Sequence, residues 1–324
     1  MKQIRALVKL VAAGIVSLVL LSAFCVVFSF SGVHVANPSG ATDYKWQSRQ
    51  WKSTMTEGFS WMKMDGRGFN NPDGVSAENP ECLIMGSSHM EAVNVSSSEN
   101  VAAQLRTLLP GMTVYNIGVS GHNIYTCAKN MKDAMSEYAP GKYVVVETDT
   151  VMLDSKTMTD VLENRFADIP SYDSGLLYYI QSYCPALKTI YKNIGDWRTA
   201  GKAAGSAEQS PFSVDKDVLE RFLSKMKEDC GDRQLIILYQ PATRIDGDGN
   251  FMESADGVKE FLDVCNRHGI VFVDMTADFR NLYQEQNILA HGFVNTAVGE
   301  GHLNRWGHRV IAEKLAEILG ENRK

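Results

Sequence analysis

Five short and almost continuously apolar runs constrain the fold more than any other feature of this chain. Each run is five or six residues long and is rich in aliphatic and β-branched side chains. The runs are Glu81–Gly86, Met112–Ile117, Tyr143–Glu147, Gln234–Tyr239 and Ile270–Asp274. Strands that are buried on both faces of a parallel sheet have this composition. The chain is therefore predicted to contain a mostly parallel, five-stranded sheet.

Helical patterns fill the gaps between these runs. Ser96–Glu99 has the spacing of a capping box before an apolar stretch, and Asp215–Glu228 places apolar residues four apart. Arg305–Leu319 carries one apolar stripe, and Gly320 follows it in the position of a C-cap. Alternation of buried strands with helices predicts a doubly wound α/β fold. Such sheets bind ligands at the carboxyl ends of their strands.

The N-terminal segment is set apart by its charge. Lys2, Arg5 and Lys9 precede an uncharged stretch, Leu10–Phe30, whose 21 residues would rise about 31 Å as a helix. This pattern predicts one transmembrane helix with a cytoplasmic N-terminus and an extracytoplasmic chain from residue 37 onward. A cleaved signal peptide is the alternative, although its apolar region is usually shorter. A lipoprotein site at Cys25 is disfavoured because Phe24 occupies a position that requires a small residue.

These features divide the chain into three parts. We expect a cytoplasmic stub and membrane anchor at 1–36, a tether and N-terminal extension at 37–79, and an α/β domain at 80–324. The Tyr-rich segment at about 150–213 is expected to be a helical insertion in that domain. The anchor holds three basic residues and no acid, so the outer part has 29 basic and 38 acidic residues, a net charge of −9. That balance argues against nucleic acid as a partner.

Cysteine and histidine spacing gives no metal or redox motif. The six cysteines have no CxxC spacing, so either one or two disulfides or buried free thiols are compatible with the sequence. The histidines show no HExxH pattern. Asp246–Asn250 is superficially similar to a calcium loop but lacks the later glycine and acid, so it is interpreted as a turn. No metal and no cofactor is predicted.

Three polar blocks lie where a doubly wound sheet places its ligands. Gly86–His89 follows the first strand, Asn116–Asn123 follows the second, and Gly299–His308 leads into the last helix. A serine after a glycine at a strand end is suited to be a nucleophile. A loop histidine accepts a hydroxyl proton, and glycines let backbone N–H groups approach an oxyanion.

Together these blocks resemble the SGNH, or GDSL-like, hydrolase superfamily. The order and spacing of the blocks agree over about residues 80–320, most specifically in the H-x-N-x-x-G-H run that begins at His302. The resemblance implies a flavodoxin-like three-layer α/β/α fold of the SGNH hydrolase type. It also implies Ser88 as nucleophile, His302 as base, and oxyanion donation by the backbone N–H groups of Ser88 and Gly121.

The sequence departs from the family pattern in three places. Ser87 replaces the Asp of the first block, and Gly299 stands where the family has the Asp that orients the base. Glu300 is the expected substitute for that second Asp; a backbone carbonyl is the other alternative. The oxyanion Asn of the third block has no clear match. For the oxyanion or substrate site, the candidates besides Gly121 are therefore Gly118, Asn123 and Thr148.

These inferences lead to a membrane-anchored serine esterase or O-acyltransferase that works through a Ser88 acyl-enzyme. The layout of an anchor and an outer domain is similar to that of surface-glycan acylation proteins of the superfamily. It implies acetyl esters of cell-envelope or extracellular carbohydrate as substrates and a multispanning membrane acyltransferase as a partner. The alternatives are a catalytically impaired protein that binds glycan or a partner, and an envelope scaffold.

Overall fold

The structure is a computed structural model that describes residues 2–29, 34–37, 40–49, 51–54, 57–166, 214–252 and 256–321. At its centre is a five-stranded sheet with the order β11-β8-β7-β5-β6, in which every neighbouring pair is parallel. Its strands are β5 (Cys82–Met85), β6 (Val114–Asn116), β7 (Tyr143–Thr148), β8 (Gln234–Tyr239) and β11 (Val271–Asp274). Each predicted apolar run coincides with one of these strands to within two residues at either end, so the predicted parallel sheet is confirmed.

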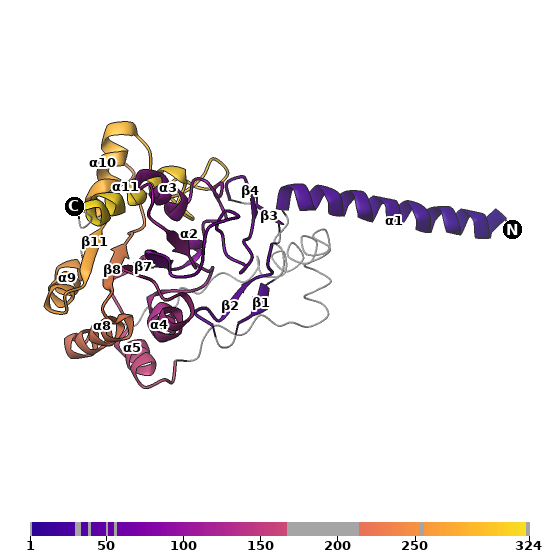
Figure 1. The fold of residues 1–324 in the computed structure, drawn as a ribbon. Helices are drawn as coiled ribbons and strands as arrows, with labels where there is room; N and C mark the ends of the chain where they lie inside the picture. Colours follow the sequence, from indigo (N-terminus) through magenta and orange to yellow (C-terminus); the bar gives the residue numbers. More distant parts are fainter. Residues whose placement is uncertain are drawn as a thin grey trace.

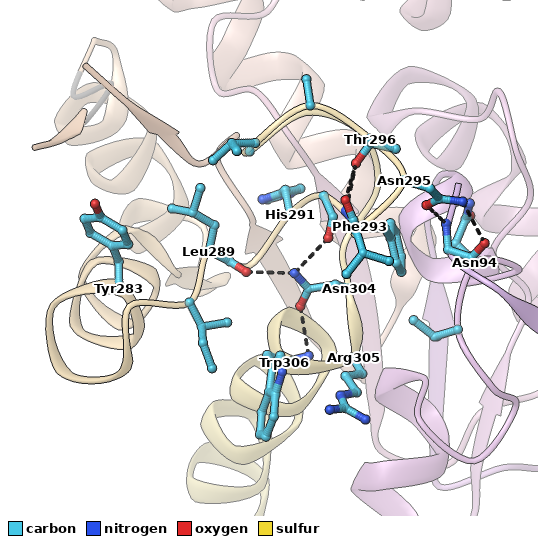
Figure 2. A pocket seen from close by; sticks show the side chains of 18 of the residues that line it. Asn94, Tyr283, Leu289, His291, Phe293, Asn295, Thr296, Asn304, Arg305 and Trp306 are labelled. Carbon is cyan, nitrogen blue, oxygen red and sulfur yellow. Dashed lines mark hydrogen bonds between the residues drawn. The ribbon is translucent and has the colours of Figure 1, made fainter. Parts of the chain in front are cut away.

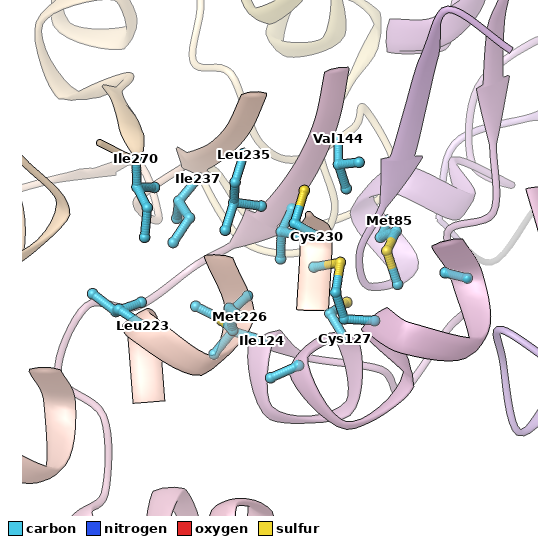
Figure 3. Close-up of a cluster of buried hydrophobic side chains, with 14 of the residues drawn as sticks. Met85, Ile124, Cys127, Val144, Leu223, Met226, Cys230, Leu235, Ile237 and Ile270 are labelled. Atoms are coloured by element: carbon cyan, nitrogen blue, oxygen red, sulfur yellow. The ribbon is translucent and has the colours of Figure 1, made fainter. Parts of the chain in front are cut away.

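Helices cover both faces of the sheet, as Figure 1 shows. One face carries α4 (Ile124–Tyr138), α5 (Ser155–Leu162), α8 (Lys216–Cys230) and α9 (Val258–Arg267). The opposite face carries α3 (Val101–Leu108), α10 (Thr276–Gln286) and α11 (Arg305–Glu321). In Figure 3, the strand residues Val144 and Ile237 face Cys127 of α4 and Met226 of α8. The predicted three-layer α/β/α architecture is confirmed.

Two helix ends differ from the sequence prediction. Asn100, rather than Ser96, caps α3, because its side-chain oxygen accepts the N–H of Ala103 at 2.8 Å. Gly320 lies inside α11, which continues to Glu321. Both differences are shifts of a few residues at helix ends, where several polar residues compete for the same free backbone groups.

Helix α1 (Lys2–Ser29) contains residues 10–29 of the predicted apolar run and projects away from the α/β body (Figure 1). Its segment Lys2–Phe24 has a mean hydropathy of 2.4, and its most apolar window is not buried against the rest of the chain. A helix of this length and composition is able to cross a bilayer. A signal anchor and a signal sequence both have these properties.

The residues between α1 and the sheet form two small antiparallel hairpins. They pair β1 (His34–Ala36) with β2 (Tyr44–Trp46), and β3 (Trp51–Thr54) with β4 (Ser60–Lys63). Tyr44, Trp46, Met62 and Phe69 are buried against the domain. Much of the segment that the sequence presents as a polar tether therefore packs on the α/β core.

Other expected features lie in peripheral parts of the domain. A third small hairpin pairs β9 (Arg244–Ile245) with β10 (Phe251–Met252), and it turns through Asp246–Asn250 as predicted. Of the expected insertion, residues 150–166 are described and contain α5, and 167–213 lie outside the described residues.

The described residues include four free, buried cysteines: Cys82, Cys127, Cys230 and Cys265. Burial raises the pKa of each of these thiols.

Candidate active site

The first polar block forms a tight turn from β5 into the one-turn helix α2 (Ser88–Glu91). The Ser87 hydroxyl caps α2 by accepting the His89 N–H at 3.2 Å. The Ser87 N–H donates to the carboxylate of Glu147, at the end of the neighbouring strand β7, at 2.8 Å. A Cβ on Gly86 would lie 2.7 Å from that carboxylate, so glycine is needed there. The sheet therefore fixes the turn that presents Ser88.

Three side chains from distant parts of the chain meet at this turn. The Ser88 hydroxyl oxygen lies 2.8 Å from Nε2 of His302, and Nδ1 of His302 lies 2.6 Å from Oε2 of Glu57. The other oxygen of Glu57 accepts the backbone N–H of His302. Because the carboxylate accepts a hydrogen bond from Nδ1–H, Nε2 is assigned as the unprotonated nitrogen that accepts the serine proton. This is the hydroxyl–imidazole–carboxylate arrangement of serine hydrolases.

The carboxyl group of Glu57 is held in its charged form. Burial raises its pKa, but the hydrogen bonds from the His302 side chain and backbone outweigh that effect and lower it below the ordinary value. A carboxylate at this position orients the imidazole and stabilises the imidazolium that forms when Ser88 loses its proton.

Glu57 takes the place that the sequence assigned to Glu300, and the expectation is corrected on this point. Glu300 is exposed, and its N–H donates to the carbonyl of Ala297 at 3.1 Å. Gly301, between Glu300 and His302, has a φ of +101°, and a Cβ on it would overlap the Glu57 carboxylate. The glycine thus lets a distant acid reach the backbone and the ring of His302.

The loop that carries Glu57 is held by two asparagines. The Asn94 amide donates to the Glu57 carbonyl at 3.1 Å. Asn295 exchanges two hydrogen bonds with Gly58, accepting its N–H at 2.8 Å and donating to its carbonyl at 3.2 Å. Asn295 precedes His302 in the same loop, so the two loops that supply acid and base are fastened together. No sequence pattern links them, because Glu57 lies 245 residues before His302.

The oxyanion candidates occupy three different environments. Gly121 lies in the loop before α4, which is tied to the nucleophile turn by a 3.1 Å hydrogen bond from the Val119 N–H to the Gly86 carbonyl. Gly118 packs against α2, and its N–H donates to Asn116 at 2.9 Å. The Ser88 N–H stands at the first position of α2. The Gly118 N–H is thus already engaged, and the oxyanion roles of Gly121 and Ser88 stay predictions.

The two side-chain oxyanion candidates have structural partners. The Asn123 oxygen caps α4 by accepting the N–H groups of Tyr125 and Thr126 at 3.0 and 3.1 Å. The Thr148 hydroxyl donates to the Thr150 carbonyl at 2.7 Å and is buried within the turn after β7. These contacts explain both side chains as elements that shape the turns around the site.

A buried polar network continues behind the nucleophile turn. Gln240 donates to Glu147 at 2.8 Å, and its oxygen lies 2.8 Å from Nε2 of His291. The other ring nitrogen of His291 lies 3.1 Å from the Thr243 hydroxyl. Burial raises the pKa of Glu147 and lowers that of His291 to about 3. The network supplies hydrogen bonds for polar groups that have no access to water.

His89 is the second histidine near Ser88. Its ring centroid lies 5.2 Å from that of His302, and its Nδ1 accepts the Leu303 N–H at 3.2 Å. Burial and the nearby His302 lower the pKa of His89 to about 4. A neutral His89 therefore supports the loop that carries the base.

No metal site emerges from the described part of the chain. Within it, no three residues of the types His, Cys, Asp and Glu are arranged to hold a metal ion. The Asp246 carboxylate accepts the N–H groups of Asp248 and Asn250, both at 2.9 Å, as expected for a turn.

No protein-family model and no curated protein matches the sequence. Among solved structures, the chain is similar to a member of the lipolytic G-D-S-L family from Veillonella parvula, with 14% identity over 74% of this chain and 97% of that chain and a TM-score of 0.43. A putative GDSL-like lipase from Parabacteroides merdae has 16% identity, coverage of 75% and 96%, and a TM-score of 0.41. The acetyl xylan esterase AlAXEase has 17% identity, coverage of 74% and 99%, and a TM-score of 0.41.

The sheet itself decides the fold. Five parallel strands in the order β11-β8-β7-β5-β6 lie between two helical layers, with the three polar blocks at their carboxyl ends. The chain has a flavodoxin-like, three-layer α/β/α fold. In this domain the turn that presents Ser88 follows β5, and His302 precedes α11. The acid comes from the loop before β4, outside the three blocks that the sequence resemblance relies on.

Proposed function

We propose that this protein is a serine esterase or O-acyltransferase that forms an acyl-enzyme on Ser88. The observation that carries the proposal is the continuous contact from Ser88 through His302 to Glu57, with distances of 2.8 and 2.6 Å. Such a chain of contacts activates a hydroxyl that is a poor nucleophile by itself.

The reaction follows from these contacts. The Ser88 oxygen attacks the ester carbonyl while its proton moves to Nε2 of His302, and the Ser88 and Gly121 N–H groups are the donors we propose for the oxyanion. Collapse of the tetrahedral intermediate breaks the ester bond, and the departing alcohol takes the proton from His302. Water, or the hydroxyl of an acceptor, then attacks the acyl-enzyme with His302 as base, which releases the acid or the new ester and restores Ser88.

The acid supplied by Glu57 bears on the alternative of a catalytically impaired protein. That alternative was motivated by the missing Asp at Gly299 and the missing oxyanion Asn. Glu57 makes the contacts that the family assigns to the missing Asp. Only the missing oxyanion Asn therefore still favours a binding protein. We therefore favour catalysis.

Location and substrate class complete the proposal. An uncleaved α1 would anchor the enzyme in the membrane with its catalytic domain outside. Acetyl esters of cell-envelope or extracellular carbohydrate are the substrates we propose, with a multispanning membrane acyltransferase as the partner that delivers or receives the acyl group. This assignment rests on the layout of an anchor and an outer domain noted in the sequence.

The test uses the full-length protein, with p-nitrophenyl acetate as substrate and a fluorophosphonate as covalent label. Ser88→Ala and His302→Ala should abolish turnover, and Ser88→Ala should abolish labelling. Ser87→Ala is the matched control, because Ser87 is adjacent and also half-buried but caps α2. Equal labelling of wild type and Ser88→Ala would refute the nucleophile. An intact protein without turnover on any acyl ester would favour the binding alternative.

A further inference from the structure

Two loops beside the candidate active site expose large apolar side chains. Phe59, just before β4, and Trp61, within it, are 62% and 48% exposed. Val294 and Val298, in the loop that leads to His302, are 108% and 74% exposed. We call these four residues the apolar rim. Single exposed apolar residues are common, but a contiguous group marks an interaction surface.

The apolar rim is one continuous surface rather than two. Gly58 and Asn295 exchange two hydrogen bonds, which hold the loop of Phe59 against the loop of Val294. Phe59, Val294 and Val298 all line one cavity of about 890 Å³, which is shown in Figure 2. Along the strand, exposed Phe59 and Trp61 alternate with buried Ser60 and Met62, so both rings point to the same side.

This surface lies on the part of the domain that is connected to α1. Helix α1 contacts β3, and β3 pairs with β4, as Figure 1 also shows. The chain advances only five residues from Ser29, the end of α1, to His34, the start of β1. Five residues span at most about 18 Å, so a bilayer crossed by α1 would lie close to these hairpins.

We propose that the apolar rim rests on the surface of the phospholipid bilayer that α1 crosses. Aromatic and branched aliphatic side chains on a membrane-proximal surface are suited to the boundary between headgroups and acyl chains. The proposal rests on the membrane anchoring included in the proposed function. It adds an orientation of the domain: Glu57 and His302, which flank the rim in sequence, would face the membrane side, so the ester group would be bound near the bilayer surface.

The test is photo-crosslinking of the full-length protein in nanodiscs of phosphatidylethanolamine and phosphatidylglycerol. The photoreactive amino acid p-benzoylphenylalanine is placed at Phe59 or at Val294. Matched controls carry it at Leu108 of α3 or Leu262 of α9, which are 44% and 36% exposed and apolar but lie on other elements. We expect phospholipid adducts, detected by mass spectrometry, to be about ten-fold more abundant at the two rim positions.

Three outcomes would overturn the proposal. Lipid adducts of equal yield at all four positions would show that the domain has no preferred orientation. Adducts to a second copy of the chain, or to another membrane protein that is co-reconstituted, in place of lipid would assign the rim to a protein partner. A mature protein that lacks α1, found by intact mass, would remove the anchor itself. None of these readouts depends on turnover, so failure of the proposed esterase activity would be seen separately.

Discussion

Two glutamates lie beside the candidate catalytic residues, and their environments are opposite. Glu57 is partly exposed, and its hydrogen bonds to His302 lower its pKa. Glu147 is only 1% exposed, and burial raises its pKa despite hydrogen bonds from Ser87 and Gln240. The first contacts the reacting imidazole, whereas the second accepts hydrogen bonds from the Ser87 backbone, in the turn that presents the nucleophile, and from the Gln240 amide.

The comparison separates two ways in which a carboxyl group serves a site. Glu57 is useful through its charge, because it must stabilise an imidazolium that exists only during the reaction. Glu147 is useful through its hydrogen bonds, because it satisfies buried donors and holds a turn. A Glu→Gln substitution, which removes the charge but keeps the shape, should therefore reduce activity far more at Glu57 than at Glu147.

The largest effect is expected for Glu57→Gln. Loss of the carboxylate leaves His302 without the partner that orients it, and kcat should fall by about a thousand- to ten-thousand-fold, as in serine proteases. Steady-state kinetics on p-nitrophenyl acetate measure the change. Glu300→Gln, in the loop of the base, is the control and should stay close to wild type. If Glu300→Gln lost as much activity as Glu57→Gln, the acid assignment would be wrong.

Gly301→Ala tests the same contact without changing either charged residue. The new Cβ would overlap the Glu57 carboxylate, and the φ of +101° is unfavourable for alanine. We expect kcat to fall by about ten- to a hundred-fold because the acid is displaced by roughly an ångström. Glu300→Ala changes the adjacent residue without this overlap, and its rate should match wild type. An unchanged rate in Gly301→Ala would contradict the close approach of the Glu57 carboxylate to the backbone at Gly301.

For Glu147 the expected effect depends on the replacement. Glu147→Leu leaves the Ser87 N–H and the Gln240 amide without an acceptor, and it should lower the free energy of unfolding by roughly 2–4 kcal/mol. Glu147→Gln is the isosteric control. If the Gln240 amide rotates and His291 moves its proton from Nε2 to Nδ1, each buried donor again finds an acceptor, so most stability and activity should remain. Urea unfolding measures the stability of both variants, and steady-state kinetics measure their activity. A loss in Glu147→Gln as large as that in Glu57→Gln would erase the contrast between the two glutamates.

His89→Gln is expected to have the smallest effect on activity. Its test is the pH dependence of kcat/KM. The pKa of His89 lies at about 4, below the ordinary value of 6.5, so this ring is already neutral at pH 5 and above. Replacing it with a neutral amide should leave the acid limb of the kcat/KM profile in place, within about 0.3 pH units. Movement of that limb by a full unit would show that His89 carries a proton in the active range.

Local patterns of residues predict the sheet, and the resemblance of the three polar blocks to the SGNH superfamily implies two of the three residues in the contact chain. Period and composition predicted all five strands, because strands buried on both faces leave nearly continuous apolar runs. Ser88 and His302 follow from that resemblance, and each stands within two residues of a glycine at an end of a regular element, where a doubly wound sheet exposes its ligands. Helix ends were predicted less well at Ser96 and Gly320, where neighbouring residues offer similar caps.

The acid that contacts His302, and the packing of the segment before residue 80, became clear only in three dimensions. Glu57 lies in a stretch that is polar and irregular in sequence, and nothing local distinguishes it from Glu300, which is adjacent to Gly301. Its role depends on contacts across 245 residues of chain. Such contacts arise from the packing of the β3–β4 hairpin on the domain and from the space left by Gly301, and neither property is encoded in a local pattern of residues.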